Sequence, residues 1–106
     1  MIQAIIEKRS NWSKSNTKVS FDSVSGLSQI FLHGHNIAEY GHSDMSLSVN
    51  NCGYETNTTK SRLNALINFV CDPLENGIFQ KGFKWFVTNN GRTESFPSDY
   101  WYSFDL

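Results

Sequence analysis

Several short segments of the chain alternate apolar and polar residues, which is typical of strands that bury one face. In residues 45–50, Met45, Leu47 and Val49 fall on one side and serines fall on the other. Residues 18–23 alternate in the same way. We therefore expect a strand in each segment, with Met45 among the inward-facing residues.

Turn-forming residues divide other apolar segments into hairpins. Residues 27–41 predict two strands that turn near Gly34 and His35. Residues 78–88 predict either a pair of strands or one kinked strand, with Gly82 at the bend. Both segments fit an antiparallel sheet.

The remaining segments are less regular. Residues 1–10 fit either a helix or a strand, and residues 10–18 are polar and turn-like, with Trp12 as their single large apolar side chain. The Asn-Asn-Gly sequence at 89–91 predicts a tight turn. Residues 100–104 alternate again, which favours a strand at the end of the chain.

One helix is predicted to begin near residues 56–58 and to end before Pro73, because a proline forces the preceding residue out of helical geometry. Four apolar residues repeat at the spacing of one helix face: Leu63, Leu66, Ile67 and Val70. The opposite, solvent-facing side is expected to carry Asn57, Lys60, Asn64 and Asn68.

The order of strands, helix and strands predicts an α+β fold, with a single antiparallel sheet of about five to six strands and one central α-helix packed on one face. The chain has 106 residues, which is enough for one hydrophobic core, so we expect a single domain over 1–106. Aromatic residues make up 14% and charged residues 18%, which favours a folded, strand-rich protein over a disordered one.

Charge and cysteine content narrow the classes of partner. The formal net charge is −1, so no overall field draws the protein to nucleic acid or to an anionic membrane, and any anion site must be local. No apolar segment approaches the roughly 18 residues of a membrane span, so we expect no membrane partner. We interpret Cys52 and Cys71 as reduced thiols of an intracellular protein, because two cysteines are too few for a disulfide framework.

Residues 55–64, Glu-Thr-Asn-Thr-Thr-Lys-Ser-Arg-Leu-Asn, place two cations near the start of the expected helix. A polar N-cap explains the threonines. It does not explain Lys60 and Arg62, because positive charge at this end opposes the helix dipole. Either Glu55 or a bound phosphate would compensate these cations. The residues expected to hold a phosphate are Thr58, Thr59, Lys60 and Arg62.

Three histidines, His33, His35 and His42, lie close together in the sequence, and three imidazoles would allow a metal site if they converged. Gly34 and Asn36 suit a turn, which favours surface or turn histidines instead. We therefore expect no metal and no cofactor. The spacing does not decide whether the three rings meet.

The aromatic residues are too many for one small core, so some must face outward. Tyr54 or Trp85 would stack on a base beside the helix start. At the end of the chain, Tyr100, Trp101 and Tyr102 would anchor a partner protein. We also expect a homo-oligomer, because an aromatic-rich sheet with an unprotected edge pairs with a copy of itself.

The chain contains FLHGHNIAEY, then SLSVNNCGYETNTTKSRLNAL, and then IFQKGFKWFV. These segments resemble a group of small proteins of unknown function encoded by tailed bacteriophages, over roughly residues 16–88. The family pattern is a Leu-His/Phe-Gly-Asn-x-Ile-Ala strand, an alternating Leu/Ser strand, and a Gly-Trp-x-Thr-x-Thr-Thr-Lys/Arg-x-Arg-Leu-Asn helix start. Here it takes the form of a Leu-His-Gly-x-Asn-Ile-Ala strand and a Thr-x-Thr-Thr-Lys-x-Arg-Leu-Asn helix start. The chain departs from it at His35, where an extra residue precedes the asparagine, and at Tyr54, where tryptophan is usual.

The resemblance implies a phage accessory protein acting in the cytoplasm of the infected host cell, and it brings no established activity. No nucleophile elbow, Cys–His pair or acidic cluster points to an enzyme. Two hypotheses remain. The first is an anti-defence binding protein for a nucleotide second messenger or nucleic acid, held at the helix start. The second is an inhibitor that docks on a host enzyme through its aromatic C-terminal strand.

Overall fold

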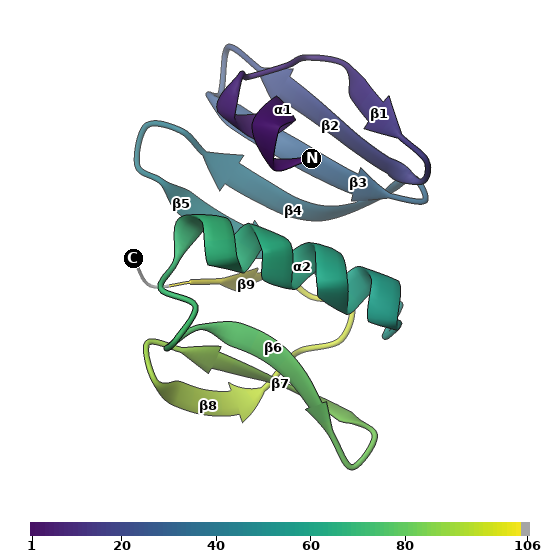
Figure 1. Ribbon diagram of the computed structural model, residues 1–106, viewed down its shortest axis with the longest axis vertical. Helices are drawn as coiled ribbons and strands as arrows, with labels where there is room; N and C mark the ends of the chain where they lie inside the picture. Colours follow the sequence, from purple (N-terminus) through teal and green to yellow (C-terminus); the bar gives the residue numbers. More distant parts are fainter. Residues whose placement is uncertain (105–106) are drawn as a thin grey trace.

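The computed structural model describes residues 1–104, and these contain two antiparallel sheets and one long helix (Figure 1). The first part of the chain forms α1 (Ile2–Ile6), β1 (Trp12–Lys14), β2 (Thr17–Asp22), β3 (Leu27–Leu32), β4 (His35–Gly41) and β5 (Ser46–Val49). The second part forms α2 (Asn57–Val70), β6 (Gly77–Lys81), β7 (Lys84–Asn89), β8 (Arg92–Ser95) and β9 (Tyr102–Ser103). The predicted α+β class is confirmed.

The larger sheet has the order β1-β2-β3-β4-β5-β9, and all its neighbours run antiparallel. It matches the expected sheet of about five to six strands with a helix on one face. The strands β6, β7 and β8 form a separate three-stranded sheet. The chain leaves the first sheet through α2, builds the second sheet, and returns to pair β9 with β5.

The hairpin expected over residues 27–41 is present as β3 and β4. His33 and Gly34 have φ values of 50° and 80°, as the two central residues of a type I′ turn require. The pairing register then shifts, because β4 carries one extra residue, Ile37, opposite β3. This bulge follows the turn directly and lies beside the pocket described below.

Two predictions for the first sheet are wrong. Residues 10–18 are not all turn, since β1 pairs with β2 from Trp12 to Lys14. Met45 does not face inward: it lies in the turn before β5 with a φ of 55° and is 62% exposed. The alternation of β5 begins only at Ser46, and Leu47 is buried as expected.

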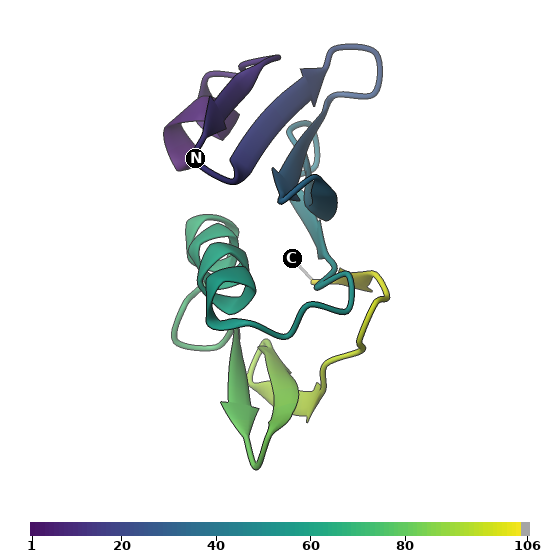
Figure 2. The ribbon, with the colours of Figure 1, turned by 90° about the vertical axis from the view of Figure 1, so that its right-hand side faces the viewer.

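The helix α2 follows its sequence pattern closely. Thr56 is the N-cap, and its Oγ1 accepts a hydrogen bond from the Thr59 N–H at 3.2 Å. Leu63, Leu66 and Ile67 are buried, which confirms the apolar face. The helix ends at Val70, before Pro73. In Figure 2, α2 lies across from the strands of the larger sheet, and it contacts both β4 and β5.

The polar side of α2 is not entirely in solvent. Asn64 was expected there, but its amide bonds to the backbone of β6: Nδ2 donates to the Ile78 carbonyl at 2.9 Å, and Oδ1 accepts from the Ile78 N–H at 2.8 Å. This side chain ties the helix to the second sheet. Asn68, one turn further on, is exposed as expected.

The second sheet resolves the alternatives for residues 78–88 in favour of a strand pair. Gly82 and Phe83 have positive φ and form the turn between β6 and β7. Asn90 and Gly91 form the next turn, as their sequence predicts. The strand expected at the end of the chain is shorter, because only Tyr102–Ser103 pairs with β5.

One cluster of buried apolar side chains joins α1, the larger sheet, α2 and the second sheet. Each of these parts contributes side chains that are at most 1% exposed, among them Ile5, Ile30, Leu47, Ile67 and Val87. Among the described helices, none has the length and apolar character needed to cross a membrane.

Candidate functional site

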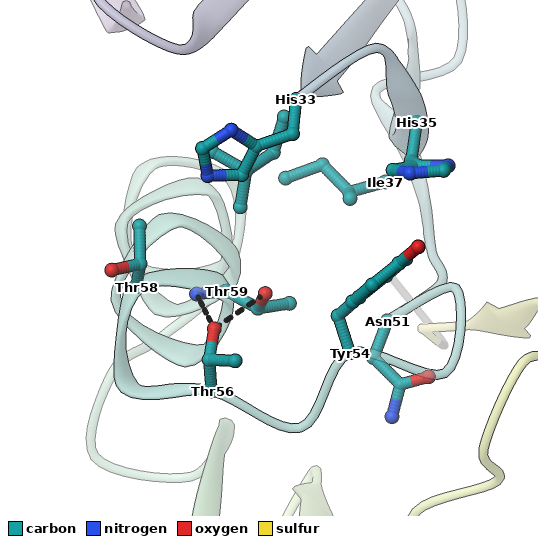
Figure 3. A pocket seen from close by; sticks show the side chains of 9 residues that line it. His33, His35, Ile37, Asn51, Tyr54, Thr56, Thr58 and Thr59 are labelled. Atoms are coloured by element: carbon teal, nitrogen blue, oxygen red, sulfur yellow. Dashed lines mark hydrogen bonds between the residues drawn. The ribbon is translucent and has the colours of Figure 1, made fainter.

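A pocket of about 380 Å³ lies where the β3–β4 turn, the loop after β5 and the start of α2 meet (Figure 3). We call it the helix-start pocket. It is lined by Leu32, His33, His35, Ile37, Asn51, Tyr54, Thr56, Thr58 and Thr59. Leu32 and Ile37 are buried and give it an apolar part. None of these lining residues is acidic, so nothing in the lining repels an anion.

The first turn of α2, which supplies Thr58 and Thr59 to the pocket lining, has unpaired backbone donors. The Thr59 N–H is capped by Thr56, and the Lys60 N–H bonds to the Thr56 carbonyl at 3.0 Å. Within residues 1–104, the N–H groups of Asn57 and Thr58 make no hydrogen bond. The first turn also contains no acidic residue. This helix end therefore combines free N–H groups with an uncompensated dipole.

Rings from the β3–β4 turn and from the loop after β5 form the other side of the pocket (Figure 3). The His35 and Tyr54 rings lie 4.7 Å apart between centroids, with 37° between their planes. His33 is held by Asn16: the His33 N–H donates to the Asn16 carbonyl at 2.9 Å, and the Asn16 amide lies 3.3 Å from His33 Nε2. An amide N–H in this contact makes Nε2 the acceptor, so Nδ1 carries the proton.

The structure does not bring the four expected phosphate-binding residues together. Thr58 is exposed and lines the helix-start pocket, but Thr59 is 1% exposed and its hydroxyl lies 3.0 Å from that of Thr56. Lys60 does not line this pocket, and it does not line the second pocket, which lies between β1 and α2. Arg62 turns away and donates from Nε to Thr17 Oγ1 at 3.1 Å. At 100° per residue, Lys60 lies about 200° around the helix from Thr58 and from Arg62. Thr58 and Arg62 share one face of the helix but lie one turn apart along it.

Trp85 is a correction to the expected stacking pair. It is 3% exposed and packs against Phe96, with 6.0 Å between ring centroids, so it offers no face to a ligand. The alternation of β7 places Trp85 and Val87 on the core side of the strand. Tyr54, which is 51% exposed, is the expected stacking residue that lines the pocket.

The aromatic residues at the end of the chain are divided between surface and interior. Tyr100 is 70% exposed and Trp101 is 40% exposed. Tyr102 is half-buried, and its hydroxyl donates to Glu94 Oε1 at 2.7 Å and accepts from Asn89 Nδ2 at 3.1 Å. Tyr100 and Trp101 are therefore accessible to a partner, whereas the Tyr102 side chain is held by hydrogen bonds within the protein.

The three histidines do not converge. His33 and His35 line the helix-start pocket, whereas His42 Nε2 lies 2.7 Å from Ser28 Oγ and its ring packs edge-on against Tyr40. Among the described residues, no group of three or more His, Cys, Asp or Glu side chains is placed to hold a metal ion. The sequence favoured surface or turn histidines and did not indicate that His33 and His35 line a pocket. The tight turn at Gly34, which brings His33 beside His35, is the signal that could have indicated it.

Both cysteines are free thiols in half-buried positions. Burial, together with the nearby Asp99 carboxylate, raises the pKa of the Cys52 thiol, and burial raises the pKa of the Cys71 thiol. Both groups therefore stay protonated at neutral pH, which makes them poor nucleophiles.

Comparison with known proteins gives the chain a family. Residues 1–103 match the family model described as Kyanoviridae Gp96 protein. The match spans nearly the whole chain, so the protein belongs to this family of tailed-bacteriophage proteins. Searches of curated proteins and of solved structures found no match.

Proposed function

We propose that this member of the Kyanoviridae Gp96 family is an accessory protein that binds a phosphate-bearing nucleotide in the helix-start pocket. The observation that carries the proposal is the pair of unpaired N–H groups of Asn57 and Thr58, beside a pocket whose lining includes no carboxylate. Phosphate oxygens accept hydrogen bonds from such N–H groups and are favoured by the positive end of the helix dipole. The exposed Thr58 hydroxyl adds a further donor.

The rest of the pocket suits the nucleoside part of such a ligand. The tilted His35–Tyr54 pair offers an aromatic surface on which a base stacks, as bases do in sequence-tolerant nucleotide sites. Leu32 and Ile37 provide apolar contact, and His33 offers an Nδ1–H donor. A volume of about 380 Å³ lies within the usual range of small-molecule sites.

A phage protein that sequesters a nucleotide second messenger would block a signal on which the host's defence depends. Sequestration requires that the protein binds the nucleotide but not that it catalyses a reaction, so the proposal includes no catalytic group. We therefore assign the protein an anti-defence role in the infected cell, with a nucleotide as its ligand.

The test uses a proline at the first helical position. The Asn57→Pro variant removes one of the two free N–H groups, and proline is well tolerated at this position of a helix. Thr56 already has extended geometry, with φ −107° and ψ 160°, which suits the residue before a proline. We expect nucleoside monophosphate affinity to fall by about tenfold to a hundredfold, because a charge-assisted hydrogen bond contributes roughly 1.5–3 kcal/mol.

The matched control is Asn57→Ala, which changes the same side chain but keeps the N–H group. Isothermal titration calorimetry with adenosine and thymidine 5′-monophosphates would measure both variants, and thermal unfolding would show that each is folded. Equal binding by the proline and alanine variants would mean that the helix start does not hold the phosphate.

A second candidate function rests on the exposed pair Tyr100 and Trp101. Tyrosine and tryptophan dominate the energetics of protein interfaces, so this pair would anchor the protein on a host enzyme. Deleting residues 99–106 would also remove β9 and the buried Phe104, so substitution is the cleaner test. The Tyr100→Ser, Trp101→Ser double variant should lose capture of a host enzyme while keeping nucleotide binding. Retained capture by this variant would exclude the pair as the anchor.

A further inference from the structure

A second pocket, of about 290 Å³, lies between β1 and α2, further along the helix than the helix-start pocket. We call it the β1–α2 groove. It is lined by Met1, Trp12, Lys14, Ser15, Thr17, Ser61, Arg62 and Ala65. The lining offers two cationic side chains, three hydroxyls and one half-buried indole, and it includes no carboxylate. None of these groups has a part in the nucleotide site proposed above.

Strand pairing and helix geometry direct the two cations into the same groove. Lys14 is the cross-strand partner of Thr17, so both side chains lie on one face of the sheet. Arg62 reaches Thr17 from the helix, with Nε donating to Thr17 Oγ1 at 3.1 Å. This contact fixes the guanidinium but leaves its terminal N–H groups without a partner among the described residues, and the Lys14 ammonium has none either.

The groove is electropositive without a compensating acid. Burial lowers the pKa of the Met1 amino group, and the Lys14 and Arg62 charges lower it further. Like charges held this close repel one another in the free protein. A bound anion would relieve this repulsion, and Arg62 offers the planar donor geometry that phosphate oxygens accept.

A chain of polar contacts runs from the groove to the helix-start pocket. Arg62 Nε donates to Thr17 Oγ1, the same hydroxyl donates to Asn16 Oδ1 at 3.2 Å, and Asn16 contacts His33 Nε2 at 3.3 Å. Along α2, Thr58 and Arg62 are four residues apart, which is a rise of roughly 6 Å. That rise is similar to the spacing of successive phosphates in an extended nucleic-acid strand.

We propose that the β1–α2 groove binds a second phosphate, and that the ligand is therefore a phosphodiester-linked nucleotide with at least two phosphates. Lys14 and the terminal N–H groups of Arg62 hold this phosphate, and the Trp12 indole stacks on the adjoining base. The assignment to one continuous ligand rests on the proposed function of the helix-start pocket. The proposed phosphate site in the groove depends only on the residues that line the groove.

The experiment compares a 5′-phosphorylated thymidine dinucleotide with thymidine 5′-monophosphate, using calorimetry at 50 mM and 200 mM salt. We expect the dinucleotide to bind at least tenfold more tightly. The Lys14→Gln and Arg62→Gln variants should each lose fivefold or more of the dinucleotide affinity, keep the monophosphate affinity, and lower the salt slope by about one. A thymidine hexanucleotide and cyclic diadenylate then distinguish a nucleic-acid strand from a cyclic messenger.

Lys18→Gln is the matched control, because Lys18 lies one residue from Thr17 on the same strand and its exposed side chain faces the opposite side of the sheet. Quenching of tryptophan fluorescence by the dinucleotide should disappear in Trp12→Phe. Equal dinucleotide binding by the Lys14→Gln and Lys18→Gln variants would overturn the groove site. If Asn57→Pro leaves dinucleotide binding unchanged while Lys14→Gln removes it, the groove stands and the helix-start proposal fails.

Discussion

At the scale of single residues, Asn64 shows how one amide can connect two parts of the fold. Its side chain both donates to and accepts from the backbone of Ile78, as a neighbouring strand would do. Asparagine is a poor helix former, so its place in the middle of α2 has a local cost. The two hydrogen bonds to β6 explain why the position tolerates it.

We predict that Asn64→Ala lowers the free energy of unfolding by roughly 1–3 kcal/mol, because it leaves the N–H and carbonyl of Ile78 without their partner. Urea denaturation would measure the change. Asn68→Ala, at an exposed position one turn further along the same helix, should stay within about 0.5 kcal/mol of the parent protein. Alanine is the better helix former, so helix propensity alone would stabilise both variants. An unchanged or raised unfolding free energy in Asn64→Ala would therefore mean that the contact with β6 does not stabilise the fold.

His42 gives the stability of the protein a dependence on pH. Burial, and to a smaller extent the Lys8 cation, lowers the pKa of His42 in the folded protein below the ordinary value of 6.5. Near and below pH 6.5, the unfolded chain therefore binds more protons at this residue than the folded protein does. Stability from this group is fully present above pH 6.5 and is lost as the pH falls.

We predict that the difference in unfolding free energy between the parent protein and His42→Gln becomes more favourable to the parent as pH rises from 5 to 8. Glutamine can still hydrogen-bond to Ser28 but does not titrate. The substitution therefore removes the contribution of residue 42 to the pH dependence of stability and keeps its hydrogen bond. Urea denaturation at several pH values would give both curves. Parallel curves for the two proteins would contradict the prediction.

At the scale of elements, the start of α2 shows what local sequence signals determine. The apolar face was predicted from spacing and is present in the structure. The sequence left the N-cap open among Thr58, Thr56 and Asn57, and the structure assigns it to Thr56. Lys60 and Arg62 were expected to hold one phosphate together, but a rotation of 100° per residue places them on different sides of the helix. Arg62 consequently lines the β1–α2 groove, and Lys60 lines neither of the two pockets.

We predict that Thr56→Ala lowers the free energy of unfolding by about 1 kcal/mol, because the Thr59 N–H loses its acceptor. Thr56→Ser keeps the hydroxyl and should restore most of the stability. Thr58→Ala, at the neighbouring exposed position, should change stability little while weakening nucleotide binding. Chemical denaturation together with calorimetry would separate capping from binding, and equal destabilisation at 56 and 58 would contradict the assignment of the cap.

At the scale of the whole molecule, the second sheet carries exposed aromatic surface. Phe79 is 38% exposed and stacks on Phe86, with 5.5 Å between ring centroids. Phe83, at the tip of the same hairpin, is 94% exposed. Exposed aromatic side chains that share one hairpin are typical of interaction sites. We propose this hairpin as the contact for the self-association expected from the sequence.

We predict a mass above that of the 12.1 kDa monomer at micromolar concentration in sedimentation velocity. The Phe79→Ser, Phe83→Ser double variant should sediment as a monomer, because it removes the apolar contact. Serine at the two solvent-exposed positions should leave the fold intact, which thermal unfolding would verify. A monomeric parent protein at these concentrations would exclude the homo-oligomer.

The sequence by itself determined the α+β class, the hairpin over 27–41 and the extent of α2, because periodicity and turn residues act over a few neighbouring positions. Only the tertiary structure decided which side chains share a pocket. Trp85 is an aromatic residue of the kind that stacks on bases, but it is buried in the core. Trp12 lines a pocket that no local pattern indicates, and the tight turn at Gly34 is the single local signal for His33 and His35. Pockets arise where distant segments meet, and their lining depends on register and helix rotation, which are set by packing of the whole core.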